Sequence, residues 1–267
     1  MLRQRLITAA ILIPLIVLIL LSTSTQALAG IISIFVLIGA WEWAALCGWQ
    51  TKLVRSFYVI LVGLLLLVSY LFLQYAIYTL IIATIWWLLA LYLTWQYQQG
   101  NDLLPTNSLV KALLGLVILI PPWIALLLLR EGYGGQWVLF LFILIWTADS
   151  GAYFAGKRWG KTKLANKVSP GKTLEGVAGA LLMGTVAAFC YVILQAIPLS
   201  FVLLCLLTIL VSILGDLLES MFKRQMGIKD SGNILPGHGG MLDRIDSLTS
   251  AAPIFVGGLI LLLAKLT

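Results

Sequence analysis

The sequence predicts an all-α, polytopic integral membrane protein, a helical bundle of about nine transmembrane helices. Of its 267 residues, 61% are hydrophobic and only 10% are charged, whereas soluble domains carry about 25% charged residues. Long apolar runs such as 59–73 and 199–214 contain no charge, which is typical of membrane-spanning segments. Lipid offers no hydrogen-bond partners to the backbone, so helices are the expected spanning elements. The ten-residue alternating patterns of outer-membrane barrels are absent.

Each span is predicted from an apolar run between more polar residues. In chain order the spans cover approximately 6–22, 27–46, 56–73, 76–95, 109–129, 136–155, 174–196, 199–219 and 251–266. Pro121 and Pro122 fall inside the fifth span, where we expect a kink because proline lacks a backbone donor.

The first span has a second interpretation. Arg3 and Arg5, the apolar stretch and Ala27-Leu28-Ala29 resemble a cleavable signal peptide. The apolar run is long for that purpose and further spans follow at once, so we expect a transmembrane helix. The sequence leaves cleavage open, and cleavage would not alter the orientation of the remaining spans.

The distribution of basic residues predicts a cytoplasmic N-terminus. With that orientation, 15 of the 17 lysines and arginines fall on the cytoplasmic side, and only Arg130 and Lys265 fall outside. Such an asymmetry follows the positive-inside rule and supports the span count as well. We therefore expect a multi-pass protein of the inner cell membrane with its polar loops in the cytoplasm.

The chain contains no long linker, low-complexity region or internal repeat, so 1–267 is predicted to form a single integral-membrane domain. Its N-terminal spans, 1–135, are interpreted as a scaffold. The remainder, 136–267, carries two charged cytoplasmic segments, 156–173 and 220–250. These two segments are the candidate site.

The first charged segment holds six cationic residues between positions 157 and 172. They could serve only as topogenic charges that attract anionic lipids. A helix start beside cations also suits phosphate oxygens, and the candidate binding residues here are Lys167, Ser169, Lys172, Thr173 and Glu175. The segment superficially resembles a P-loop, but Asn166 stands where glycine is required and we expect no β-strand before it.

Several carboxylates are predicted at membrane depth, where they are costly and therefore suggest function. Asp149 lies near the cytoplasmic end of the sixth span, and Asp216 and Glu219 share one helical face because they are three residues apart. For Glu42, in the second span, a structural hydrogen bond or salt bridge is an equally good interpretation.

The stretch from Ser220 to Asp246 concentrates four basic residues, three aspartates and the only histidine of the chain. Asp243 and Asp246 are three apart, and with Asp216 they could form an oxygen cage for Mg²⁺, which binds a few carboxylates together with substrate phosphates. Glycines flank His238 and would let the backbone approach a ligand closely. Whether His238 is catalytic or structural stays open. For Asp243 and Asp246, the alternative is that they are solvated charges at the membrane interface.

Carboxylates, cations and glycine turns at one interface are the groups required for phosphoryl or nucleotidyl transfer. A lipid substrate would enter sideways from the bilayer, and a charged co-substrate would arrive from the cytoplasm. An ion-coupled transporter would instead distribute its polar residues at mid-depth over several spans.

Two motifs resemble the signature of the phosphatidate cytidylyltransferases, also called CDP-diacylglycerol synthases. The second charged segment reads Ser220-x-x-Lys223-Arg224-x4-Lys229-Asp230-x5-Pro236-x-His238-Gly239-Gly240-x-x-Asp243-Arg244-x-Asp246. Upstream stand Asp149-x-x-Ala152-Tyr153-x-x-Gly156-Lys157 and Ser169-Pro170-x-Lys172-Thr173-x-Glu175-Gly176. The motifs cover about the last 120 residues, and the N-terminal part is similar only in general character.

The resemblance implies that the protein transfers CMP from CTP to phosphatidate, with release of pyrophosphate and a requirement for Mg²⁺. It implies metal-binding carboxylates at Asp216, Asp243 and Asp246, and catalytic roles for these three, Lys223 and His238. The implied substrate-binding residues are Asp149, Lys167, Ser169, Lys172, Thr173, Glu175, Ser220, Arg224, Lys229 and Arg244.

A CTP-dependent polyprenol or phytol kinase is the nearest alternative, because it too is a polytopic enzyme with cytoplasmic motif loops. A CDP-alcohol phosphotransferase is disfavoured, because its Asp-Gly-x-x-Ala-Arg opening is missing. We expect CTP, phosphatidate and membrane lipids as partners and no nucleic acid. The acyl-chain preference, a homodimer and a second, monovalent cation are left open.

Overall fold

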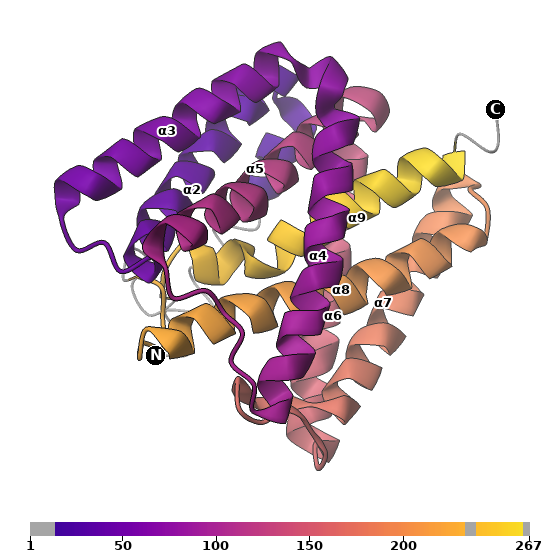
Figure 1. Ribbon diagram of the computed structural model, residues 1–267. Helices are drawn as coiled ribbons and strands as arrows, with labels where there is room; N and C mark the ends of the chain where they lie inside the picture. The colour runs from indigo at the N-terminus through magenta and orange to yellow at the C-terminus, as the bar shows by residue number, and fades with distance from the viewer. Residues whose placement is uncertain (1–13, 233–238, 264–267) are drawn as a thin grey trace.

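A computed structural model describes residues 14–232 and 239–263, which form a bundle of long helices (Figure 1). The helices are α2 (Thr25–Leu46), α3 (Lys52–Leu71), α4 (Ala76–Gln99), α5 (Ser108–Tyr133), α6 (Gly135–Trp159), α7 (Leu174–Gln195), α8 (Ser200–Gln225) and α9 (Leu242–Leu263). A 3₁₀ turn, Leu73–Tyr75, precedes α4, and residues 14–22 are helical.

Eight of the described helices are long and apolar enough to cross a membrane, which confirms the predicted all-α polytopic membrane fold. The ninth predicted span, 6–22, lies only partly within the described residues. Most helix bounds agree with the predicted spans to within a few residues. Two helices differ more: α8 runs on to Gln225, past the predicted end at 219, and α9 begins at Leu242 rather than near residue 251, so Asp243 and Asp246 lie in its first turns.

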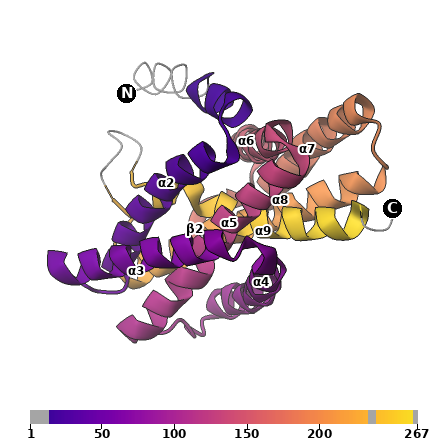
Figure 2. The ribbon, with the colours of Figure 1, turned by 90° about the horizontal axis from the view of Figure 1, so that it is seen from above.

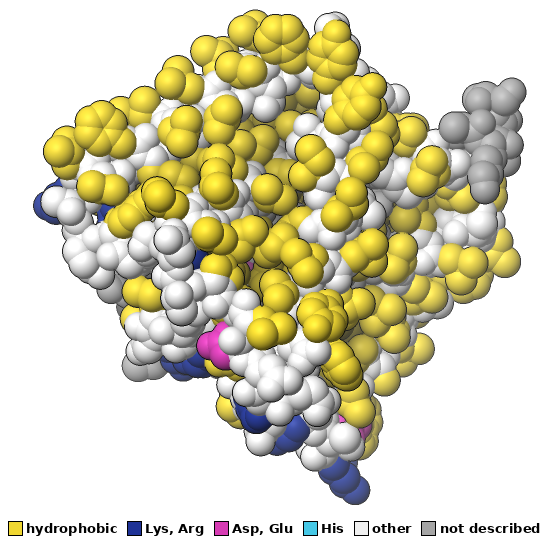
Figure 3. Space-filling model, viewed as in Figure 1, with side chains coloured by type: hydrophobic (Ala, Val, Ile, Leu, Met, Phe, Trp, Pro, Cys, Tyr) yellow, Lys and Arg dark blue, Asp and Glu magenta, His cyan; other side chains and the backbone are white. Residues whose placement is uncertain are grey.

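Helices α5 and α9 lie in the middle of the bundle, with the other helices arranged around them (Figures 1 and 2). In α5, 72% of the apolar membrane-spanning stretch is buried inside the protein, compared with 17% in α3 and in α7. Apolar side chains cover most of the face seen in Figure 3, as expected of a surface solvated by lipid. The helix α5 runs on through Pro121 and Pro122, which are both buried.

The segment before α7 contains a small antiparallel hairpin, β1 (Lys163–Ala165) and β2 (Ser169–Thr173). The expectation of no strand before α7 was therefore wrong. The strands are too short to show an alternating pattern, and local contacts stabilise them: Lys163 Nζ donates to Pro170 O at 2.7 Å. A two-stranded antiparallel hairpin still differs from the strand–loop–helix of a P-loop.

Basic side chains gather along the left and lower margins of Figure 3, over the hairpin and the neighbouring helix ends. Arg130, one of the two exceptions to the charge rule, binds the carbonyl oxygens of Leu20 and Thr23. It therefore satisfies the backbone at the end of the helix that includes residues 14–22. The cytoplasmic orientation of the charged margin stays a prediction.

Candidate active site

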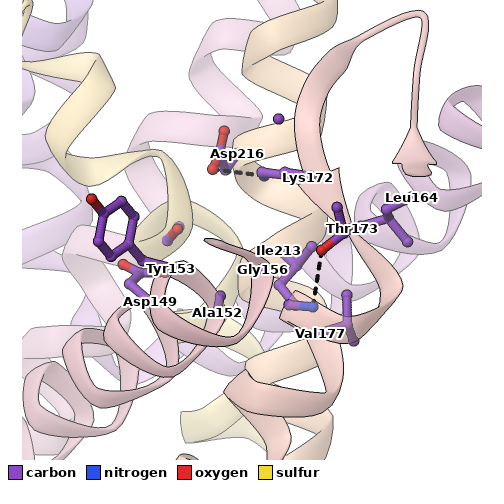
Figure 4. Close-up of a pocket in the computed structure, with 13 residues that line it drawn as sticks. Asp149, Ala152, Tyr153, Gly156, Leu164, Lys172, Thr173, Val177, Ile213 and Asp216 are labelled. Carbon is purple, nitrogen blue, oxygen red and sulfur yellow. Dashed lines mark hydrogen bonds and ion pairs between the residues drawn. The ribbon is translucent and has the colours of Figure 1, made fainter. Parts of the chain in front are cut away.

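A pocket of about 160 Å³ lies between α6, the hairpin, the start of α7 and α8 (Figure 4). It is lined by Asp149, Ala152, Tyr153, Gly156, Leu164, Gly171, Lys172, Thr173, Gly176, Val177, Ile213, Asp216 and Ser247. Both charged segments therefore contribute to one pocket, the segment 220–250 through Ser247 alone. We call four of these residues, Asp149, Lys172, Thr173 and Asp216, the pocket group.

Lys172 and Asp216 form an ion pair in this pocket, with Nζ and Oδ2 2.6 Å apart. Asp149 lies within electrostatic range of both residues. Apart from this ion pair, Lys172 Nζ has no hydrogen-bond partner within the described part of the chain. An ammonium group that has three donors and engages one carboxylate retains capacity for an anionic ligand.

The start of α7 is fixed beside α6 by close backbone packing. Thr173 is the N-cap of α7, and its Oγ1 accepts a hydrogen bond from Gly176 N at 3.1 Å. Further along, a Cβ on Gly151 would lie 2.5 Å from Gly179 O, so only glycine permits this approach. The helix N-terminus and its free backbone N–H groups are thereby held at the pocket, in an arrangement that suits phosphate oxygens.

Tyr153 stands at the rim of the pocket and is 60% exposed. The nearby Lys157 Nζ lies 5.6 Å from the centre of its ring. Phe154 and Trp159 are also exposed on this end of α6, as aromatic side chains commonly are at a membrane interface. The pocket thus lies beside a surface suited to lipid headgroups.

A second set of charges is buried beside the pocket, between α2, α8 and α9. Lys223 Nζ lies 2.5 Å from Asp243 Oδ1 and 3.1 Å from Glu219 Oε1. Asp243 Oδ2 accepts hydrogen bonds from Gly240 N at 2.8 Å and from both N and Oγ of Ser231 at 3.0 Å. We call Glu42, Glu219, Lys223, Ser231 and Asp243 the buried cluster.

Glu42 is 3% exposed and joins this cluster from α2. Its carboxylate accepts hydrogen bonds from Met241 N at 2.9 Å, Leu242 N at 2.8 Å and Ser231 Oγ at 3.0 Å. The structure therefore supports the interpretation of Glu42 as a residue that makes structural hydrogen bonds. No pattern in the sequence indicated that its partners would lie about 200 positions away.

The glycines of the second charged segment approach these carboxylates rather than an open site. A Cβ on Gly240 would lie 2.6 Å from Glu42 Oε1, and one on Gly239, where φ is +78°, would lie 2.7 Å from Asp243 Oδ2. The conformational freedom of glycine is used here to wrap the backbone around buried carboxylates. His238, between the glycines, lies outside the described residues.

The structure places only part of the predicted site in the pocket. Asp149, Lys172, Thr173 and Asp216 line it, and Ser220 Oγ lies 3.4 Å from Asp216 Oδ1. Lys223 and Asp243 belong to the buried cluster instead. Ser247, which follows Asp246 directly, lines the pocket and was missed, because a serine next to an aspartate carries no distinctive signal.

The remaining predicted binding residues do not line the pocket. Glu175 accepts hydrogen bonds from Thr162 N at 3.1 and 3.2 Å and so ties the hairpin to α7. Arg224 Nε donates to Val168 O at 3.4 Å and joins α8 to the hairpin. Lys167, Lys229 and Arg244 are exposed, and Ser169 is half-buried in β2. Their contacts with substrate stay predictions.

The predicted three-aspartate cage is not assembled in the described part of the chain, where no three carboxylate, histidine or cysteine side chains converge as metal ligands. Both oxygens of Asp243 already have protein partners. Asp216 and Asp246 fit a cation better than Asp243 does, because Asp246 lies within electrostatic range of Asp216. Their helices meet closely, since a Cβ on Gly215 would lie 2.5 Å from Asp246 O. Two carboxylates together with substrate phosphates are a typical Mg²⁺ environment.

Comparison with known proteins supplies independent information. Residues 3–261 match the model of the cytidylyltransferase family. The chain is 43% identical to the phosphatidate cytidylyltransferase of Pseudomonas aeruginosa, with 96% of each chain covered. It is 39% identical to the protein of the same name from Haemophilus influenzae, over 96% of this chain and 97% of that one. The Bacillus subtilis protein of that name is 45% identical over 126 residues, 46% of this chain and 47% of the relative.

Proposed function

Because this chain belongs to the cytidylyltransferase family and is a membrane-embedded nucleotidyltransferase, we propose that it transfers CMP from CTP to phosphatidate. Relatives that carry the name phosphatidate cytidylyltransferase over nearly the full length support this assignment. The observation in the structure that carries it is the pocket group. There a lysine, a helix N-terminus and two carboxylates meet beside an aromatic rim suited to lipid.

The proposed reaction is an in-line phosphoryl substitution. An oxygen of the phosphatidate phosphate attacks the α-phosphorus of CTP, and the bond between the α-phosphorus and the bridging oxygen to the β-phosphate breaks. The products are CDP-diacylglycerol and pyrophosphate, which carries away the bonding electrons. Little covalent chemistry falls to the protein in such reactions, so positioning and charge stabilisation dominate.

In this proposal, Lys172 and the backbone N–H groups at the start of α7 bind phosphate oxygens of the nucleotide. The Lys172–Asp216 ion pair is exchanged when substrate arrives, because Lys172 then engages phosphate. Asp216 and Asp246 would hold Mg²⁺, which when bound neutralises phosphate charge and draws electrons from phosphorus. Asp243 and Lys223 keep their mutual ion pair.

The placement of the site supports entry of the two substrates from different phases. The exposed Tyr153 of α6 lies on one side of the pocket, and the basic hairpin lies on the other (Figure 4). We infer that the lipid phosphate enters beside Tyr153 and that CTP enters beside the hairpin, on the cytoplasmic side of the inner membrane. Basic side chains around the pocket would attract both anions.

Labelled nucleotide provides the test. Purified protein in detergent, with phosphatidate and Mg²⁺, is supplied with CTP labelled either in the cytosine ring or in the γ-phosphate. Transfer of CMP puts the cytosine label into the lipid and leaves the γ label in pyrophosphate. Lipid that carries the γ label alone would establish a CTP-dependent kinase and overturn the proposal.

A further inference from the structure

The buried cluster lies one helical turn from Asp216 on α8 and Asp246 on α9, which lie within electrostatic range of each other. Glu219 follows Asp216 by three residues on α8, and Asp243 precedes Asp246 by three on α9. Three residues along a helix correspond to about 4.5 Å and to the same face. Whatever holds Glu219 and Asp243 in place therefore also sets the separation and rotation of Asp216 and Asp246.

Lys223 connects the two helices in this cluster, but one ion pair does not fix the rotation of α9. The N-terminus of α9 needs a second fixed point, because the first backbone N–H groups of a helix have no partner within it. The carboxylate of Glu42 supplies that point by accepting hydrogen bonds from Met241 N and Leu242 N. A carboxylate at a helix N-terminus is also electrostatically favourable.

Glu42 also binds the other end of the glycine-containing segment. Ser231 Oγ lies 3.0 Å from Glu42 Oε2 and 3.0 Å from Asp243 Oδ2. The two ends of the segment, at Ser231 and at Gly240–Leu242, are thus held together by the carboxylates of Glu42 and Asp243. Glu42 comes from α2, in the half of the chain whose predicted role is a scaffold.

We propose that Glu42 is a positioning residue for nucleotidyl transfer, which sets the register of α9 and thereby the placement of Asp246 relative to Asp216. This inference rests on the proposed function, because the reaction supplies the readout. Glu42 does not line the pocket, so its effect on the reaction is indirect. Displacing a reacting group by about 1 Å can lower a rate about 100-fold.

Three variants separate positioning from folding. Glu42→Gln keeps the size of the side chain but turns an amide N–H₂ toward donors. Glu42→Asp keeps the charge on a shorter side chain, and Glu42→Ala leaves buried N–H groups without an acceptor. The matched control is Glu131→Gln, which removes an exposed carboxylate near the C-terminal end of α5.

The measurement is kcat and KM for CTP, expressed per folded molecule, together with the thermal midpoint in detergent. We expect Glu42→Gln to lower kcat about 10- to 100-fold with KM changed much less, because the bound geometry and not the phosphate contacts is disturbed. Glu42→Asp should recover part of kcat, and Glu131→Gln should behave as wild type.

Wild-type kcat per folded molecule in Glu42→Gln, or a loss that only tracks the folded fraction, would overturn the inference. If Glu42→Ala fails to fold, Glu42→Gln and Glu42→Asp still decide the matter. A wild-type protein without CMP transfer would instead defeat the proposed function. The wild-type assay therefore comes first and distinguishes the two failures.

Discussion

The pocket group and the buried cluster contain the same kinds of residue but differ in how their charges are satisfied. In the pocket, Lys172 has one carboxylate partner, and the side chains of Lys172 and Asp216 are 23% and 34% exposed. In the cluster, Lys223 has two carboxylate partners, and its side chain is 8% exposed. Partly exposed charges with few partners can exchange them for a ligand, whereas buried and saturated charges cannot without a large penalty.

This difference bears on the roles that the resemblance implies, which stay predictions. Lys223 and Asp243 belong to the most distinctive part of the signature, yet they bind each other and hold α8 and α9 together. Lys172 and Asp216 come from less distinctive positions and face the pocket. Proximity in a sequence motif therefore does not separate residues that contact a substrate from residues that position them.

The largest expected effect follows substitution of Asp216 and Asp246, the aspartates proposed to hold Mg²⁺. Asp216→Asn and Asp246→Asn should each lower kcat roughly 1000-fold, because a neutral amide stabilises neither a cation nor the developing charge. Turnover of labelled CTP measures the loss, and circular dichroism establishes that the protein is folded. Asp102→Asn, in an exposed loop, serves as the control. Retained activity in either Asp216→Asn or Asp246→Asn would remove that residue from the chemistry.

Breaking the buried cluster should act mainly on stability. Lys223→Met leaves Glu219 and Asp243 buried without their cation, and removing one partner of a buried ion pair destabilises a protein by about 3–5 kcal/mol. Thermal unfolding in detergent is the measurement, with exposed Lys229→Met as the matched control. Unchanged stability of Lys223→Met would mean that the cluster is not the structural element described above.

Removing the pocket cation should act on binding with little effect on stability. Lys172→Met should raise KM for CTP about 10- to 100-fold, because a charge-assisted hydrogen bond contributes about 1.5–3 kcal/mol. Lys161→Met, an exposed lysine of the same basic segment, should leave KM near the wild-type value. Equal effects of the two substitutions would indicate that only general positive charge matters.

The smallest effect is expected at Glu175. Its exposed carboxylate accepts hydrogen bonds from Thr162 N, and Glu175→Gln keeps one acceptor oxygen for that bond. Turnover should therefore stay within about twofold of wild type. A loss as large as that of Asp216→Asn would instead support the predicted contact between Glu175 and substrate.

The fold could be predicted from the sequence because lipid imposes strong constraints on composition. Long apolar runs, interrupted by few charges, predicted eight spans that match the described helices. The start of α9 was predicted too late because its first turns carry Asp243, Arg244 and Asp246, which interrupt the apolar pattern. The hairpin before α7 was missed because strands of three and five residues leave no periodic signal.

The site was only partly predictable. Four of the candidate residues, Asp149, Lys172, Thr173 and Asp216, line one pocket, but the sequence could not separate them from the buried cluster. That separation depends on Glu42, whose partners are about 200 positions away. Pairings of this kind depend on how helices pack, and no local pattern records them.

The most direct test of this difference between pocket and cluster is the stabilisation caused by CTP and Mg²⁺ in thermal unfolding. A ligand at 100 times its Kd stabilises the folded protein by about 2.7 kcal/mol. Without ligand, Lys172→Met should unfold at a temperature near the wild-type midpoint, and it should lose most of the shift that the ligand causes. Without ligand, Lys223→Met should unfold at a lower temperature than wild type, and it should keep the ligand-induced shift. A shift that survives in Lys172→Met and disappears in Lys223→Met would contradict the account.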